Sequence, residues 1–180
     1  MTDVEDAGLL PLIRSRVSPL AFDPAHDLDP ATVQSLLEAA RWAPSAGNSQ
    51  PWAFHLWPRG SAGHRMVIDR LAPSSARWAP AASALVVNLA HVEVEDSGME
   101  FSEFADYDLG QAVAHMILHA HSIGLSCRQF RAFDLAALEQ DLQVAPGWRI
   151  RTLTAIGRAA GETPRTPRRD VAEVAADGVR

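Results

Sequence analysis

Residues 40–52, which read ARWAPSAGNSQPW, constrain the fold more than any other stretch of the chain. Pro44 and Pro51 fix their own φ angles and disfavour helix at the residue before each of them. Gly47 lies between them and permits a tight bend. A helix must therefore end near Pro44, and an extended segment must begin near Pro51.

The same loop carries hydrogen-bonding side chains of two kinds: the hydroxyls of Ser45 and Ser49 and the amides of Asn48 and Gln50. Amides both donate and accept hydrogen bonds, which suits a flat heterocycle edged with donors and acceptors. The same residue types would also suit a solvated connector between a helix and a strand. The composition of the loop alone does not decide between these two interpretations.

The pattern around this loop predicts an α+β chain. Asp29 and Pro30 are typical of a helix N-cap and first helical position, and the apolar residues that follow them recur with helical spacing up to the loop. Further helices are expected over residues 9–16, over residues 104–123 and after Asp134, with short helices within 58–79. Strands are expected over residues 52–57, 84–90 and 148–157, and residues 92–103 as an exposed excursion.

Composition excludes several classes of function. All 16 basic residues are arginine, so neither a lysine Schiff base nor a P-loop lysine is available. No G-x-G occurs, so the dinucleotide-binding fingerprint is absent. The net charge of −6 argues against non-specific nucleic-acid binding, and no apolar run is long enough to span a membrane. Together with the single cysteine, Cys127, and the acidic N-terminus, these features favour a cytoplasmic protein.

Two further segments carry arginine in patterns that fit phosphate binding. Arg16 and Ser18 lie two residues apart after the first expected helix, where they could hold a phosphate together or simply lie at the surface. Near the C-terminus, in the run RTPRR, Arg168 and Arg169 directly follow Pro167. This tail could equally be a disordered segment that happens to be rich in arginine.

Four segments of the chain resemble motifs of the nitroreductase family of FMN-dependent NAD(P)H oxidoreductases. They occur along the chain in the same order as in that family. The loop is similar to the family pattern A-P-S-x-x-N-x-Q-P-W, and residues 16–22 are similar to R-x-S-x-[RK]-x-F, except that Leu20 replaces the second basic residue. Residues 108–125 resemble the core helix D-x-G-x-A … A-x-x-x-G-L, and AIGRAAGETP resembles the last strand and its exit. The resemblance covers residues 16–169.

The resemblance implies a single domain over residues 1–180 with a nitroreductase-like fold, in which helices flank a mixed, mostly antiparallel sheet. It implies a homodimer that holds FMN between its subunits, with the tail 158–180 extending onto the partner. Sharing the cofactor is physically plausible, because a small chain has difficulty burying a three-ring group alone. The implied cofactor-binding residues are Arg16, Ser18, Pro44, Ser45, Asn48, Gln50, Arg168 and Arg169.

The reaction implied by the resemblance is a ping-pong hydride transfer from NADH or NADPH, through the flavin, to a nitroaromatic, a quinone or an activated alkene. It requires no catalytic side chain and no metal. Because Leu20 removes a positive charge expected beside the flavin, a non-catalytic FMN-storage protein of the same fold stays an alternative. A zinc hydrolase built on His115 and His119, which have the i, i+4 spacing of metal ligands, is a third, although neither the H-E-x-x-H glutamate nor a third ligand is evident.

Overall fold

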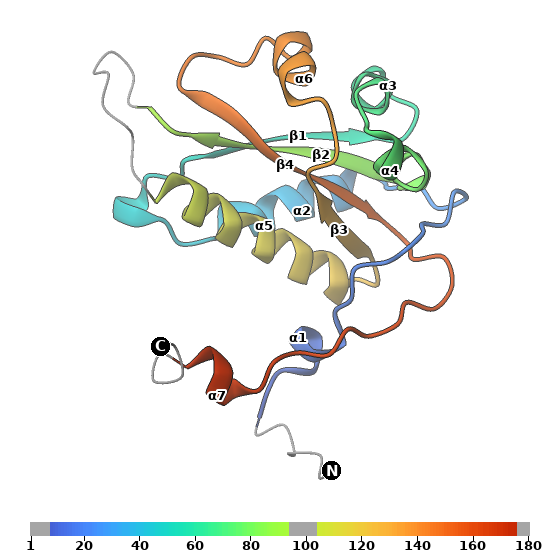
Figure 1. The fold of residues 1–180 in the computed structure, drawn as a ribbon, viewed down its shortest axis with the longest axis vertical. Coiled ribbons are helices and arrows are strands. Elements are labelled where there is room, and N and C mark those ends of the chain that lie inside the picture. The colour runs from blue at the N-terminus through green and yellow to red at the C-terminus, as the bar shows by residue number, and fades with distance from the viewer. Residues whose placement is uncertain (1–7, 94–103, 176–180) are drawn as a thin grey trace.

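A four-stranded antiparallel sheet lies at the centre of the molecule (Figure 1). The computed structural model describes residues 8–93 and 104–175. The strand order is β1-β2-β4-β3, with β1 at Trp52–Pro58, β2 at Ala84–His91, β3 at Ser126–Phe130 and β4 at Trp148–Gly157. Neighbouring strands alternate in direction, so each pairing among the described strands is antiparallel, in line with the expected mostly antiparallel sheet.

Helices cover both faces of this sheet (Figure 1). The helices of the described chain are α1 (Pro11–Ser15), α2 (Pro30–Arg41), α3 (Ala62–Asp69), α4 (Pro73–Ala76), α5 (Ala105–Ser122), α6 (Leu135–Asp141) and α7 (Val171–Val174), with 3₁₀ turns η1 (Ala46–Asn48) and η2 (Ala79–Ala81). Of these, α1 and α7 lie beyond α5, away from the sheet (Figure 1). The expected N-caps are confirmed, because Asp29 accepts from the backbone N–H of Thr32 and Asp134 from that of Ala137. The α+β class predicted from the sequence is therefore confirmed.

Strand β2 is buried over nearly its whole length, which confirms the central strand predicted from its apolar run. On one face Val86 packs in a cluster with Leu36 of α2 and Met116 of α5. On the other face Val87 belongs to the cluster that contains Val67 of α3 and Leu138 of α6. Each such side chain contributes about 1.5–3 kcal/mol when fully buried, so α2 and α5 are fixed firmly against the sheet.

Two parts of the chain were not fully assigned from the sequence. Strand β3 was not predicted, because residues 126–130 alternate too briefly to show a period; it pairs with the end of β4. Of the predicted excursion at 92–103, residues 94–103 lie outside the described part of the chain. No helix in the described ranges is both long and apolar enough to cross a membrane.

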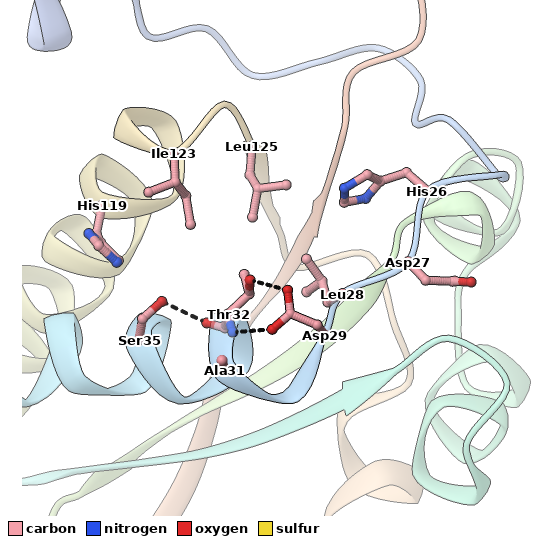
Figure 2. A pocket seen from close by; sticks show the side chains of 10 residues that line it. All are labelled: His26, Asp27, Leu28, Asp29, Ala31, Thr32, Ser35, His119, Ile123 and Leu125. Carbon is pink, nitrogen blue, oxygen red and sulfur yellow. Dashed lines mark hydrogen bonds between the residues drawn. The ribbon is translucent and has the colours of Figure 1, made fainter.

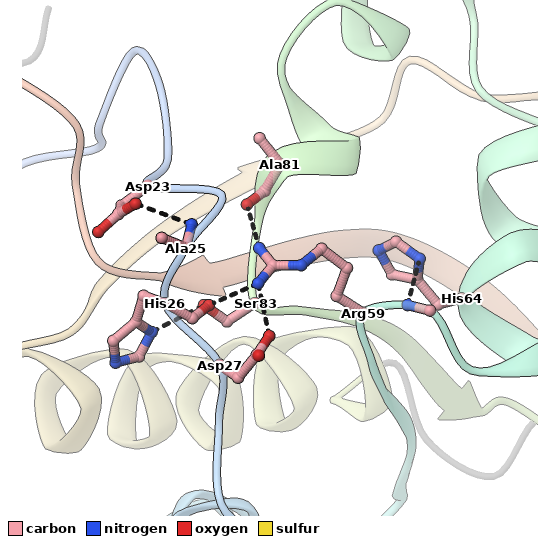
Figure 3. Close-up of polar contacts among 9 residues, drawn as sticks. Asp23, Ala25, His26, Asp27, Arg59, His64, Ala81 and Ser83 are labelled. Atoms are coloured by element: carbon pink, nitrogen blue, oxygen red, sulfur yellow. Dashed lines mark hydrogen bonds and ion pairs between the residues drawn. The ribbon is translucent and has the colours of Figure 1, made fainter.

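An arginine fixes the segment that leads from the N-terminal region into α2 (Figure 3). The guanidinium of Arg59 donates to the carbonyl oxygens of Ala81 (3.0 Å) and His26 (2.9 Å) and forms an ion pair with Asp27. The hydroxyl of Ser83 also donates to the His26 carbonyl, at 2.6 Å. These contacts hold residues 26–27 against the start of β2, so the chain on either side of them has a defined course.

Candidate functional site

The loop between α2 and β1 has a backbone conformation that ordinary residues seldom adopt. Gly47 has a φ of 58°, Asn48 of 57° and Gln50 of 49°. A non-glycine residue in this left-handed region is strained by roughly 1–2 kcal/mol. Strain of this kind persists where the surroundings impose it, and it is found most often at functional sites.

Asp108, in the first turn of α5, imposes part of this conformation. Its carboxylate is buried and accepts from the backbone N–H of Ala46 at 2.9 Å, and also from the side chain of Gln111 at 3.2 Å. Inside the loop, the Ser45 hydroxyl accepts from the backbone N–H of Gln50 at 2.9 Å. The sequence predicted Asp108 only as part of the helix motif, and its contact with the loop was missed. The signal that could have shown it is an acidic residue at a position where the helical pattern places a buried side chain.

The loop is thus held by Asp108 and by its own hydrogen bonds, while several of its side chains reach the surface. Pro44, Asn48 and Gln50 are exposed and Ser45 is half-buried. The hydroxyl of Ser49 is buried and has no hydrogen-bond partner among the described residues. Buried hydroxyls normally have a partner, so this loop has the hydrogen-bonding capacity that the sequence indicated.

Arg16 and Ser18 lie elsewhere, beside the outer face of α5. Together with α5 and β3 they line a cavity of about 480 Å³, here called the helix cavity. Its other lining residues are Gly110, Ala114, Ile117, Leu118, Cys127 and Gln129. A Cβ atom added at Gly110 would meet nothing within 4 Å, so a flat group can approach the helix closely here.

Cys127 forms part of the wall of the helix cavity but is not reactive there. It is 3% exposed, and burial raises the pKa of its thiol to about 12, against the opposing influence of Arg16. A thiol with this pKa is protonated at neutral pH and is a poor nucleophile.

A second cavity, of about 620 Å³, lies between α1 and the C-terminal tail and is here called the arginine cavity. It is lined by Arg14, Arg16, Arg165, Arg168 and Arg169, together with Leu9, Ile13, Val17, Thr166, Pro167 and Val171. Arg165 also donates a hydrogen bond to the carbonyl of Arg14. The structure therefore places three predicted phosphate-binding residues, Arg16, Arg168 and Arg169, around one cavity.

These arginines meet because the two ends of the chain run antiparallel beside each other. Phe22 forms a bridge with Ala159, and hydrogen bonds join Asp23 to Arg158 (2.9 Å) and Ala160 to Ala21 (3.0 Å). Beyond this pairing, the N-terminal segment and the tail continue in opposite directions, which brings residues 14–16 opposite residues 165–168. Contact across so long a sequence separation leaves no periodic signal in the sequence.

Of the eight predicted site residues, the structure thus brings four together around two adjoining cavities, since Arg16 lines both. Pro44, Ser45, Asn48 and Gln50 line neither cavity in the same chain. The described part of the tail lies beside α1 of its own chain (Figure 1), where Arg168 lines the arginine cavity with Arg16 of the same chain.

A third cavity, of about 520 Å³, lies between the start of α2 and the end of α5 and contains no predicted cofactor residue (Figure 2). Its polar groups largely serve the helix itself: Asp29 accepts from Thr32, and Ser35 donates to the Thr32 carbonyl. His119 reaches this cavity, but within the described ranges no three histidine, cysteine or acidic residues are grouped as metal ligands would be.

Comparison with known proteins places this chain in one family. Residues 13–102, half of the chain, match the profile of the nitroreductase family. The chain therefore belongs to the nitroreductase family.

Relatives of similar length support this placement. A protein of Streptomyces coelicolor named as an NADH dehydrogenase/NAD(P)H nitroreductase is 26% identical over 86% of this chain and 89% of its own. One of the same name from Rhodopseudomonas palustris is 26% identical over 76% of this chain and 79% of its own. A crystal structure described as an oxidoreductase containing FMN superposes with a TM-score of 0.88, at 25% identity over 99% of this chain and 98% of its own. An enone reductase of fatty-acid biohydrogenation shares the fold, with a TM-score of 0.79 at 20% identity over 94% and 96% of the two chains.

Proposed function

We propose that this protein is an FMN-dependent oxidoreductase, which takes a hydride from NADH or NADPH and passes it to an electron-poor small molecule. Nitroaromatics, quinones and activated alkenes are the acceptor classes in question. The observation that carries the proposal is the position of Arg16 between two adjoining cavities, one walled by small and apolar residues and one lined by arginines. Family membership and the similarity to an FMN-containing oxidoreductase support it.

The residues of these cavities fit the two ends of FMN. Guanidinium groups bind phosphate oxygens through paired hydrogen bonds, so Arg16 and Arg168 would hold the phosphate, with Arg169 beside them. Ser18 would add a hydroxyl. The helix cavity, with open space at Gly110, would take the ring system.

The loop residues would come from a second copy of the chain. They line neither cavity in their own chain, yet their backbone is held in a strained conformation and their amides are exposed. Large aromatic side chains at this end of the molecule are also exposed: Trp42 by 71%, Tyr107 by 68% and Phe104 by 49%. Exposed apolar clusters are typical of protein interfaces, so we infer a homodimer in which Pro44, Ser45, Asn48 and Gln50 contact the cofactor of the partner.

In this arrangement the chain binds and orients, and the bound cofactor supplies the hydride chemistry. Arg16 and Arg168 neutralise the phosphate and fix its position. The amides of Asn48 and Gln50 would hydrogen-bond the polar edge of the ring and orient it. Gly110 and the small side chain of Ala114 would leave room for the ring beside α5. No acid, base or nucleophile of the protein is assigned to the reaction.

One observation keeps FMN storage as a second candidate. Leu20, at the position where the family pattern has a basic residue, is 58% exposed and offers no charge. Arg16 is the one charged residue among those that line the helix cavity in the described structure. A flavin without a positive charge near its pyrimidine edge is harder to reduce, because the reduced form is anionic.

The visible absorption spectrum of the purified protein tests the proposed function. We expect a flavin spectrum that bleaches when NADH or NADPH is added without oxygen and that recovers when a quinone follows. A flavin spectrum that neither donor bleaches would favour storage. A protein that takes up no FMN when FMN is supplied would refute the proposal. Membership of the family would then describe only the fold.

A further inference from the structure

The arginine cavity carries more positive charge than the phosphate of FMN requires. Besides Arg14, which has a contact of its own, four guanidinium groups line it, and none of its described lining residues is acidic. A phosphomonoester carries at most two negative charges, and Arg16 and Arg168 are enough to match them. Gathering further like charges is unfavourable unless an anion balances them, so the cavity is suited to a second anionic group.

The composition of the cavity indicates what kind of anion this is. Sites that bind the free 2′-hydroxyl of NADH typically present a carboxylate to it, whereas sites for the 2′-phosphate of NADPH present arginine. A carboxylate would repel that phosphate, and the described lining contains none. Leu9, Ile13 and Val171, all exposed beside the same cavity, offer apolar surface against which an adenine ring can pack.

We propose that Arg165 binds the 2′-phosphate of NADPH, so that NADPH and not NADH is the donor. This inference rests on the proposed function. Arg165 is well placed because its guanidinium donates to the carbonyl of Arg14, which holds the side chain over the cavity while other N–H groups stay available. The donor's adenosine would then lie between α1 and the tail, and its nicotinamide would extend toward the helix cavity.

The test compares donors and donor fragments on the FMN-loaded protein. We expect kcat/KM to be about tenfold or more higher for NADPH than for NADH, the effect of one charge-assisted contact. Arg165→Ala should reduce kcat/KM for NADPH about tenfold more than that for NADH, and Arg165→Lys should recover part of the loss. By calorimetry, adenosine 2′,5′-bisphosphate should bind the wild type more tightly than 5′-AMP does, and this difference should shrink in Arg165→Ala. Arg77→Ala, an exposed arginine near α4, is the matched control and should leave both ratios unchanged.

The outcomes separate this inference from the function on which it rests. Equal use of NADH and NADPH by a protein that retains and reduces its flavin would overturn the inference alone. An Arg165→Ala variant with an unchanged ratio of NADPH to NADH activity would overturn it too. A variant that loses FMN, and loses activity with both donors equally, would also overturn it, because Arg165 would then bind the flavin phosphate. A wild type that neither donor reduces would instead contradict the proposed function.

Discussion

Replacing Asp108 with alanine removes the carboxylate that ties the 44–50 loop to α5. The hydrogen bond from the Ala46 N–H to this buried carboxylate is charge-assisted, and losing such a bond destabilises the folded state by about 1.5–3 kcal/mol. The contact with Gln111 adds little, because that side chain is only half-buried and can turn toward water. Alanine is the better helix former by up to about 0.7 kcal/mol, so we expect a net loss of about 1–2.5 kcal/mol.

Asp106→Ala provides a control in the same helical turn. It removes a carboxylate from the same end of α5 and gains the same helix propensity, but its ion pair with Arg151, at 2.6 Å, is exposed. Such pairs contribute about 0–1 kcal/mol. Urea unfolding at a fixed protein concentration should therefore separate the two variants by about 1–2 kcal/mol.

Hydrogen exchange at Ala46 provides the local readout for the same pair of variants. We expect the Ala46 amide to exchange faster in Asp108→Ala and at the wild-type rate in Asp106→Ala. Equal stability of the two variants, together with unchanged exchange at Ala46, would refute the claim that Asp108 holds the loop.

Three further predictions follow from individual residues. Leu20→Arg should raise the flavin reduction potential and speed anaerobic reduction by NADPH, as measured by redox titration and stopped flow; a lower potential would contradict the charge argument. Hydrogen bonds from Arg41 and Trp42 lower the pKa of Glu38 to about 2. The stability that Glu38 contributes should therefore be complete above about pH 4.5 and lost as the pH falls toward 2. The difference in unfolding free energy between Glu38→Gln and the wild type should shrink across this range, and a constant difference would argue against the contact. Because burial raises the pKa of Cys127 to about 12, iodoacetamide at pH 8 should label this residue only in denaturant, and rapid labelling of the folded protein would show that the site is open.

Local chemistry made the elements around the loop predictable. Asp29 and Pro30 specify the start of α2, Pro44 and Pro51 specify where the loop begins and ends, and the apolar run at 84–90 indicated a buried strand. These signals depend on neighbouring residues, whose steric and hydrogen-bonding preferences act within one turn of helix or a few residues of strand. Strand β3 lacked such a signal, because five residues are too few to establish a period.

The arrangement of the site depends on contacts between distant parts of the chain. Arg16 and Arg168 were each predicted from local motifs, but their shared cavity results from the pairing of Phe22 with Ala159, which no local pattern encodes. The role of Asp108 was missed for the same reason, since its partner Ala46 lies on another element. Arg165 carried no motif of its own, and only the fold shows that it lines the same cavity.

In the proposed dimer, one FMN site is built from the cavities of one copy and the loop of another. A dimer of two differently tagged variants tests it directly: one chain carries Arg16→Ala and Arg168→Ala, and the other carries Asn48→Ala and Gln50→Ala. Each variant alone has every site damaged, but the mixed dimer has one intact site. The quantity to measure is the number of FMN molecules bound per purified mixed dimer. The account predicts one tightly bound FMN per mixed dimer and little in either parent, whereas a mixed dimer that retains no more FMN than its parents would contradict a site shared between copies.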